Sequence, residues 1–329
     1  MRKLYLFFCI AFGLMLSNFY LYKMAVKTKS ISDLDSFSHD ERVLCLIGGI
    51  KDFVNQYYKD FIPYAIKKNH VVIDKTEYVR NIATMYDIMQ LQLHFYAREK
   101  SVYGINSNVL NKINENADWY LSIYKKNPSS MRQASAFLAL LLRTFSNVKY
   151  ENDIKQITET LYQQIDELEP QFELGEVLMA LSILDPKKDL LNDQINKIIK
   201  NIEKNVPSLD DIFQYNWLSK FILVYHNDHS RRIFTILCEK VRNVLRLFTY
   251  EEETNYLAVA FECLASLLLY DKSIDVVDLI ENLTEKLIKR QNHTYGLFEF
   301  KNGDMRFDIT GHIINGFVCL DKGNLKSLH

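Results

Sequence analysis

Asp308 and His312 have the residue types and the spacing of an acid–base pair. They are four positions apart, so on a helix their side chains share one face. A carboxylate beside an imidazole can take up and release a proton near neutral pH, as general acid–base catalysis requires. Arg306 could bind a ligand carboxylate or brace the local backbone. The alternative is structural: Asp308 or Thr310 caps the helix, and His312 is a hydrogen-bonded core residue.

Two further glutamates are candidate catalytic carboxylates. Glu176 lies inside an apolar run, where an unpaired carboxylate is costly; Glu262 poses the same problem. Glu253 ends an acidic triplet, which could equally be a solvated first turn favoured by the helix dipole. Pairing of the buried glutamates with Arg80 or Arg132 would be the structural solution. The predicted catalytic set is Asp308, His312, Glu176 and Glu253.

Aromatic and basic side chains recur at the same places as these carboxylates. Aromatic faces can stack on sugar rings, although core packing explains such residues equally well. The predicted substrate-binding set is Tyr78, Arg80, Arg132, Tyr215, Trp217, Tyr256 and Arg306.

Metal, cofactor and nucleic-acid sites are not expected. His226 and His229 are two possible ligands without others nearby, which is weak evidence for a metal; Asp228 or Ser230 is expected to cap the next helix. The sequence has no glycine-rich phosphate loop and no nucleophile elbow. Its net charge of −1 argues against phosphate-backbone binding.

Two kinds of helix must position these residues. The first is amphipathic, with apolar residues at steps of three and four, and is expected at 42–68, 106–126, 150–168, 187–204, 229–247 and 274–290. The second is apolar nearly all round and therefore buried; it is clearest at 134–142, 174–184 and 256–269.

A polar cluster precedes or opens each buried helix. The markers are Tyr78, Ser130, Glu173, Gln214, Glu253 and Asp308, which are 52, 43, 41, 39 and 55 residues apart. A period of this kind indicates stacked helix pairs. Six pairs with apolar inner helices favour a closed ring, while an open solenoid is the alternative. In a ring, the inner-helix N-termini would gather at one mouth.

The last repeat carries a family resemblance. Residues 291–317 hold Asn302-Gly303 between short alternating stretches, which predicts a β-hairpin near 297–307. This repeat resembles those of the α/α toroid proteins, the group of six-hairpin glycosidases, sugar epimerases and terpenoid cyclase-like domains. The resemblance implies an all-α fold, an (α/α)6 toroid of alternating outer amphipathic and inner apolar helices. The Asp-rich motif of terpenoid cyclases and the zinc ligands of lanthionine-forming cyclases are absent.

The N-terminus predicts attachment to a membrane. Residues 4–22 are uncharged and long enough to span a bilayer as a helix; a cleaved signal peptide is the alternative. The expected organisation is a membrane segment at 1–23, a polar linker at 24–40 and the toroid domain at 41–329. A single N-terminal span before a large domain favours a body outside the cytoplasm, in the periplasm or at the cell surface.

These features lead to one functional expectation and its rival. The resemblance and the polar helix starts imply a membrane-tethered, carbohydrate-active enzyme, a polysaccharide hydrolase, lyase or epimerase, with a glycan ligand and no cofactor. The alternative is a non-catalytic binding or assembly scaffold of the cell envelope. Protein partners stay open.

Overall fold

The computed structural model describes residues 39–96, 104–146, 148–168, 173–185, 188–248, 253–292, 294–301 and 303–325. The predicted membrane segment at 4–22 and nearly all of the linker lie outside these residues. The chain divides into two compact units, and the second, Gly48–His329, contains every element discussed below except the start of the first described helix.

The described residues form twelve α-helices and four short strands, which confirms a mostly helical fold. The apolar helices are α3 (Tyr78–Tyr96), α5 (Arg132–Thr144), α7 (Leu174–Leu184), α9 (Asp211–Val224), α11 (Thr254–Tyr270) and α13 (Phe307–Leu325). The helices that alternate with them are α2 (His39–Tyr57), α4 (Ser107–Lys126), α6 (Glu151–Gln164), α8 (Lys188–Lys204), α10 (Asp228–Leu247) and α12 (Val277–Ile288).

The alternating helices owe their form to one apolar stripe and to caps. In α10 the buried residues Ile233, Leu237, Val241 and Val244 recur at steps of four, four and three, one face of a helix. The cap of α10 is Asn227, whose side chain accepts a hydrogen bond from the Ser230 amide at 3.0 Å. The expectation that Asp228 or Ser230 would cap this helix was therefore wrong.

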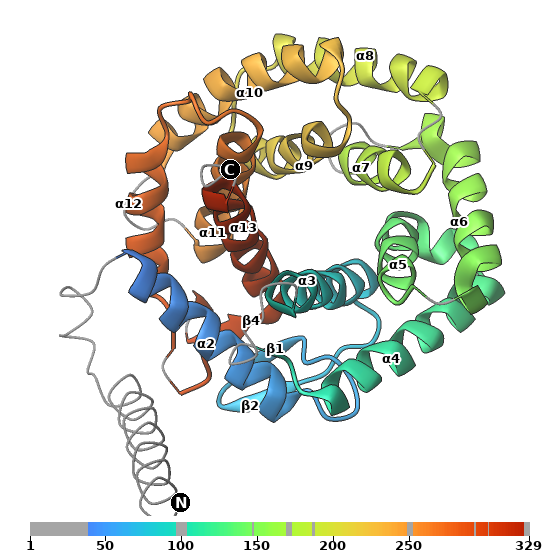
Figure 1. The fold of residues 1–329 in the computed structure, drawn as a ribbon, viewed down its shortest axis with the longest axis vertical. Coiled ribbons are helices and arrows are strands. Elements are labelled where there is room, and N and C mark those ends of the chain that lie inside the picture. The colour runs from blue at the N-terminus through green and yellow to red at the C-terminus, as the bar shows by residue number, and fades with distance from the viewer. Residues whose placement is uncertain are drawn as a thin grey trace, which may run out of the picture. The chain divides into compact units, whose positions relative to one another are not determined.

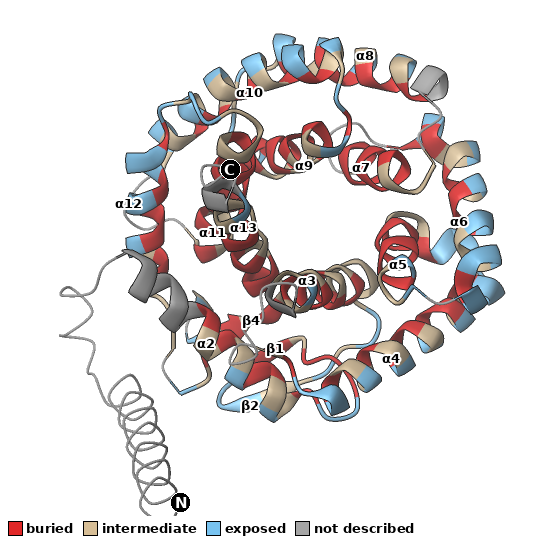
Figure 2. Cartoon of the chain, in the orientation of Figure 1, coloured by how far each residue is buried: buried red, intermediate tan, exposed pale blue. Residues whose placement is uncertain are grey.

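The six apolar helices pack against one another in sequence order. α3 contacts α5, α5 contacts α7, α7 contacts α9, α9 contacts α11, α11 contacts α13, and α13 returns to contact α3. Figures 1 and 2 show these six as the inner layer, with the exposed sides of the outer helices turned away from them. Gly316 lets α13 approach α11 closely, since an added Cβ there would lie 2.3 Å from the Phe261 ring.

A four-stranded antiparallel sheet joins the two ends of the helical series. Its strands are β1 (Ala65–Lys67), β2 (His70–Val72), β3 (Glu299–Lys301) and β4 (Asp304–Arg306), in the order β2-β1-β4-β3. The predicted hairpin near 297–307 is confirmed as β3–β4. The predicted helix at 42–68 was wrong beyond Tyr57, because residues 65–72 pair with each other and with β4.

The described part of the chain contains no helix that is both long enough and apolar enough to cross a membrane.

Candidate functional site

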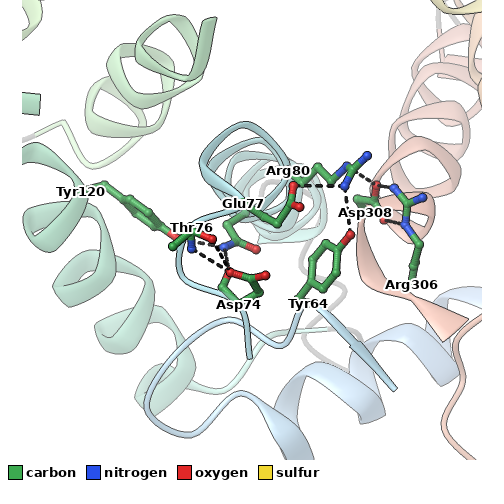
Figure 3. Close-up of polar contacts among 9 residues, drawn as sticks. Tyr64, Asp74, Thr76, Glu77, Arg80, Tyr120, Arg306 and Asp308 are labelled. Carbon is green, nitrogen blue, oxygen red and sulfur yellow. Dashed lines mark hydrogen bonds and ion pairs between the residues drawn. The ribbon is translucent and has the colours of Figure 1, made fainter. Parts of the chain in front are cut away.

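Two arginines meet one carboxylate where α3 and α13 begin (Figure 3). Arg306 Nε donates to Asp308 Oδ1 at 2.9 Å, and its Nη2 also bonds Asp308. Arg80 Nε lies 3.4 Å from Asp308 Oδ2, while Arg80 Nη1 donates to Tyr64 at 2.9 Å and to Glu77 at 3.0 Å. Asp308 is thus held by two of the three predicted binding arginines, and the Arg80 side chain stays 41% exposed.

The starts of neighbouring inner helices also contact one another elsewhere. On α5 and α7, Arg132 lies 3.9 Å from Glu173, and Gln133 donates to Glu176. On α9 and α11, the Tyr256 hydroxyl donates to Asp210 at 2.6 Å. Neighbouring inner helices therefore run in the same direction at these pairs, with their polar first turns together.

Glu176 is a protonated acid rather than an ion at neutral pH. The carboxyl group is buried in the first turn of α7. Burial raises the pKa of Glu176 to about 8, against the opposing effects of the Gln133 hydrogen bond and the Lys220 charge. A carboxyl group kept neutral in this way can donate a proton.

A second charged cluster, around Glu262, is more deeply buried. Glu262 is fully buried in α11, and both of its oxygens are occupied. Lys220 Nζ lies 2.8 Å from Oε1, while His312 Nδ1 lies 2.7 Å and Asn216 Nδ2 lies 2.6 Å from Oε2. His312 and Lys220 keep 18% and 14% of their side chains exposed, whereas Glu262 keeps none.

The charges in this cluster stabilise one another. Burial alone would raise the pKa of Glu262, but the Lys220 charge and the His312 contact outweigh it and lower this pKa to about 2. Burial would lower the pKa of Lys220, but Glu262 and Asp87 raise it. Because ionised Glu262 only accepts hydrogen bonds, His312 Nδ1 carries the donated proton, and Nε2 is the ring nitrogen that does not contact Glu262.

Asp87 of α3 completes the cluster. Its Oδ1 accepts from Asn315 Nδ2 at 2.7 Å, and its Oδ2 lies against Gly311, where an added Cβ would be 2.4 Å away. Burial raises the pKa of Asp87 to about 6, although the Lys220 charge lowers it. Asp87 therefore changes its charge close to neutral pH.

Trp217 lies beside the cluster and bridges helices that are not neighbours in the inner layer. Its ring centroid is 5.4 Å from that of Phe137 on α5 and 6.3 Å from that of His312 on α13. Lys220 Nζ lies 4.3 Å from the same ring. Side chains from α5, α9 and α13 therefore meet at this level.

The remaining predicted residues have separate settings. Tyr78 packs its ring edge-on to Tyr120 at 6.1 Å. Tyr215 is buried, and its hydroxyl has no hydrogen-bond partner among the described residues. Glu253 is the N-cap residue of α11, where its backbone carbonyl accepts from Tyr256 at 3.0 Å. The structure brings Arg80, Arg306 and Asp308 together, and Trp217 with His312, but it pairs Asp308 and His312 with different residues.

Sequence analysis missed Asp87, Lys220, Asn216 and Asn315. The available signal was one charged residue among mainly apolar neighbours. Asp87 lies within Met85–Met89, and Lys220 precedes Phe221 in α9. The same reasoning did single out Glu176 and Glu262.

Two cavities lie away from these polar clusters. One of about 640 Å³ lies near the C-terminal ends of α5 and α7, and one of about 500 Å³ lies near the C-terminal end of α11. In the described part of the chain, no group of three or more His, Cys, Asp or Glu residues could hold a metal ion.

Comparison of the chain with protein-family models, with curated proteins and with solved structures gives no significant match. A function for this chain therefore rests on the chemistry of its own residues.

Proposed function

We propose that this protein is a carbohydrate-active enzyme whose general base is His312, positioned by Glu262. The observation that carries this proposal is the 2.7 Å contact between His312 Nδ1 and Glu262 Oε2. A carboxylate behind an imidazole fixes its tautomer and stabilises the imidazolium ion that forms after proton uptake. The partly exposed imidazole leaves its other nitrogen for a substrate proton.

The carboxylates favour a lyase or an epimerase over a hydrolase. Glycoside hydrolysis needs an acid and an ionised carboxylate that faces the sugar or a water molecule. Glu262 is ionised but fully buried, with both oxygens engaged. A base that removes the proton beside a uronate carboxyl group suits His312 better, and Arg80, exposed at the start of α3, has the charge and fork geometry to bind such a carboxylate.

We also propose the α/α toroid class and attachment to the membrane through residues 4–22. The closed order of inner-helix contacts supports the toroid, and the uncharged N-terminal run supports the anchor. A glycan substrate at the cell envelope then fits a body outside the cytoplasm. Tyr256 at the start of α11 and Trp217 in the middle of α9 are half-buried and supply aromatic faces for sugar rings.

Proton abstraction is tested by NMR in D2O. The full chain is incubated with polygalacturonate, alginate or hyaluronan. An epimerase replaces the hydrogen on the carbon beside the carboxyl group with deuterium, whereas a lyase leaves a new C=C bond at that carbon and a cleaved glycosidic bond. Wild-type protein is expected to give one of these two products from one of the polymers, and His312→Gln should reduce the rate by at least about a hundredfold. Absence of both products from all three polymers would contradict the proposal.

His94→Gln is the matched control. His94 of α3 also pairs with a carboxylate, at 2.6 Å from Asp321, but it is outside the Glu262 cluster. This variant should keep the wild-type rate. Equal losses of rate in both variants would mean that a His–carboxylate contact matters only for folding. Circular dichroism of each variant would show whether folded structure is lost.

A non-catalytic envelope scaffold is the second candidate. It is favoured by the contacts of Trp217 with Phe137 and His312, which place side chains between non-neighbouring helices. The two arginines on Asp308 are likewise a structural arrangement as they stand. Wild-type protein that binds a glycan in the same experiments without deuterium uptake and without an unsaturated product would support this second function.

A further inference from the structure

The cavity of about 500 Å³ beside α10 and α11 is chemically distinct from the Glu262 cluster. Its lining residues are His226, Arg231, Phe234, Thr235, Tyr270 and Asp271. The volume falls within the roughly 300–1,000 Å³ of small-molecule pockets. The lining of the larger cavity, at α5 and α7, contains no aromatic residue.

Aromatic rings form one wall of this cavity. The Tyr270 ring lies 4.9 Å from that of Phe234 and 6.3 Å from that of His226, nearly parallel to the latter at 19°. Tyr270 and Phe234 are half-buried, so each keeps part of its surface for a ligand. An apolar ring face of this kind packs against the C–H face of a sugar.

The polar lining offers donors and an acceptor at the same place. Asp271 is ionised, because hydrogen bonds from Ser273 and the charge of Arg231 lower its pKa. Arg231 supplies guanidinium donors on the exposed side of α10. The charges of Asp271 and Arg231 cancel, so the lining has no net preference for an anionic or a cationic ligand. Vicinal hydroxyl groups, each a donor and an acceptor, match an adjacent carboxylate and guanidinium.

We propose that this cavity binds a neutral sugar ring, with the ring face on Tyr270 and Phe234 and its hydroxyl groups on Arg231 and Asp271. Such a site would hold a glycan at the outer helices, apart from the residues proposed to react. The proposal is independent of the proton-transfer chemistry, because no lining residue belongs to the Glu262 cluster.

The site is tested by calorimetric titration of the full chain with cellotetraose, maltotetraose and chitotetraose. At least one of these neutral probes should bind. Tyr270→Ala and Arg231→Gln should each weaken that binding by about tenfold, since each removes a stacking surface or a charge-assisted hydrogen bond. Arg231→Gln changes an exposed side chain, so it tests the site even where Tyr270→Ala disturbs folding.

Arg232→Gln is the matched control, because the neighbouring arginine pairs with Glu203 at 2.6 Å and does not line the cavity. It should leave the affinity within about twofold of wild type. His312→Gln should also leave it unchanged, which separates this site from the proposed catalytic base. Failure of all three probes to bind, or binding that neither Tyr270→Ala nor Arg231→Gln weakens, overturns the proposal.

Discussion

Two buried glutamates, Glu176 of α7 and Glu262 of α11, have pKa values shifted in opposite directions. The Glu262 carboxylate contacts the side-chain nitrogens of Lys220, His312 and Asn216, and its pKa falls to about 2. Glu176 receives one amide from Gln133, which does not offset burial, and its pKa rises to about 8. A pair of titratable groups with pKa values pushed apart is the arrangement that acid–base chemistry uses.

Glu176→Gln should change how stability depends on pH. The folded-state pKa of Glu176 is raised above its ordinary value of 4.5, so its contribution is fully present below about pH 4.5 and is lost as pH rises through about 8. Glutamine keeps the acceptor for Gln133 without a titrating proton. The variant should be more stable than wild type at pH 9 by about 1–3 kcal/mol, and nearly equal at pH 4.5, in urea unfolding.

Glu167→Gln provides the control, since that carboxylate is exposed and lies 3.7 Å from Arg132. Its unfolding curve should follow wild type within about 0.5 kcal/mol at both pH values. A Glu176→Gln variant that loses stability at pH 9 would show that the ionised carboxylate is the stabilising form.

For individual residues, sequence spacing identified the candidate residues better than it identified their contact partners. Asp308 and His312 do follow one another on α13, but Asp308 contacts Arg80 from α3 and His312 contacts Glu262 from α11. Those contacts join residues far apart in the sequence, and local periodicity contains no information about them. Two signals reached the Glu262 cluster: the spacing from Asp308 identified His312, and a charge inside an apolar stretch identified Glu262.

The helices were predictable because each has a strong local pattern. The expected segment at 174–184 matches α7, and 106–126 and 229–247 differ by one residue at the start from α4 and α10. The failure beyond Tyr57 has a local and a non-local part. Strand β1 pairs with the adjacent strand β2, a local hairpin that sequence analysis missed. It also pairs with β4, more than 230 residues later, and the local sequence does not reveal that partner.

Glycines at helix contacts provide a prediction for the packing of elements. An added Cβ at Gly316 of α13 would lie 2.3 Å from Phe261 of α11, so Gly316→Ala should destabilise the protein by about 1–3 kcal/mol. Gly48 of α2 has nothing within 4 Å of the same position, so Gly48→Ala should stabilise it by up to about 1 kcal/mol. Thermal unfolding of the two variants measures both effects. Equal and small shifts would contradict a close α11–α13 contact.

Two separate contacts join the two ends of the helical series. Helix α13 packs on α3, and β4 pairs with β1 through Ala65–Arg306 and Ile66–Met305. In an open repeat array each unit contacts only its neighbours, so a terminal defect stays local. A closed series has no free terminal unit, and a defect at its junction should reach every helix.

Met305→Ala tests this closure. Met305 is buried opposite Ile66 in the sheet, and loss of a buried methionine side chain should cost about 2–5 kcal/mol. In hydrogen exchange at moderate urea, the amides of α7, far from the sheet in sequence, should lose as much protection as those of α13. Met179→Ala, a buried methionine in α7 itself, should give the same uniform loss. If Met305→Ala exposes α13 while α7 keeps its protection, the helices unfold as an open series and the junction does not couple them.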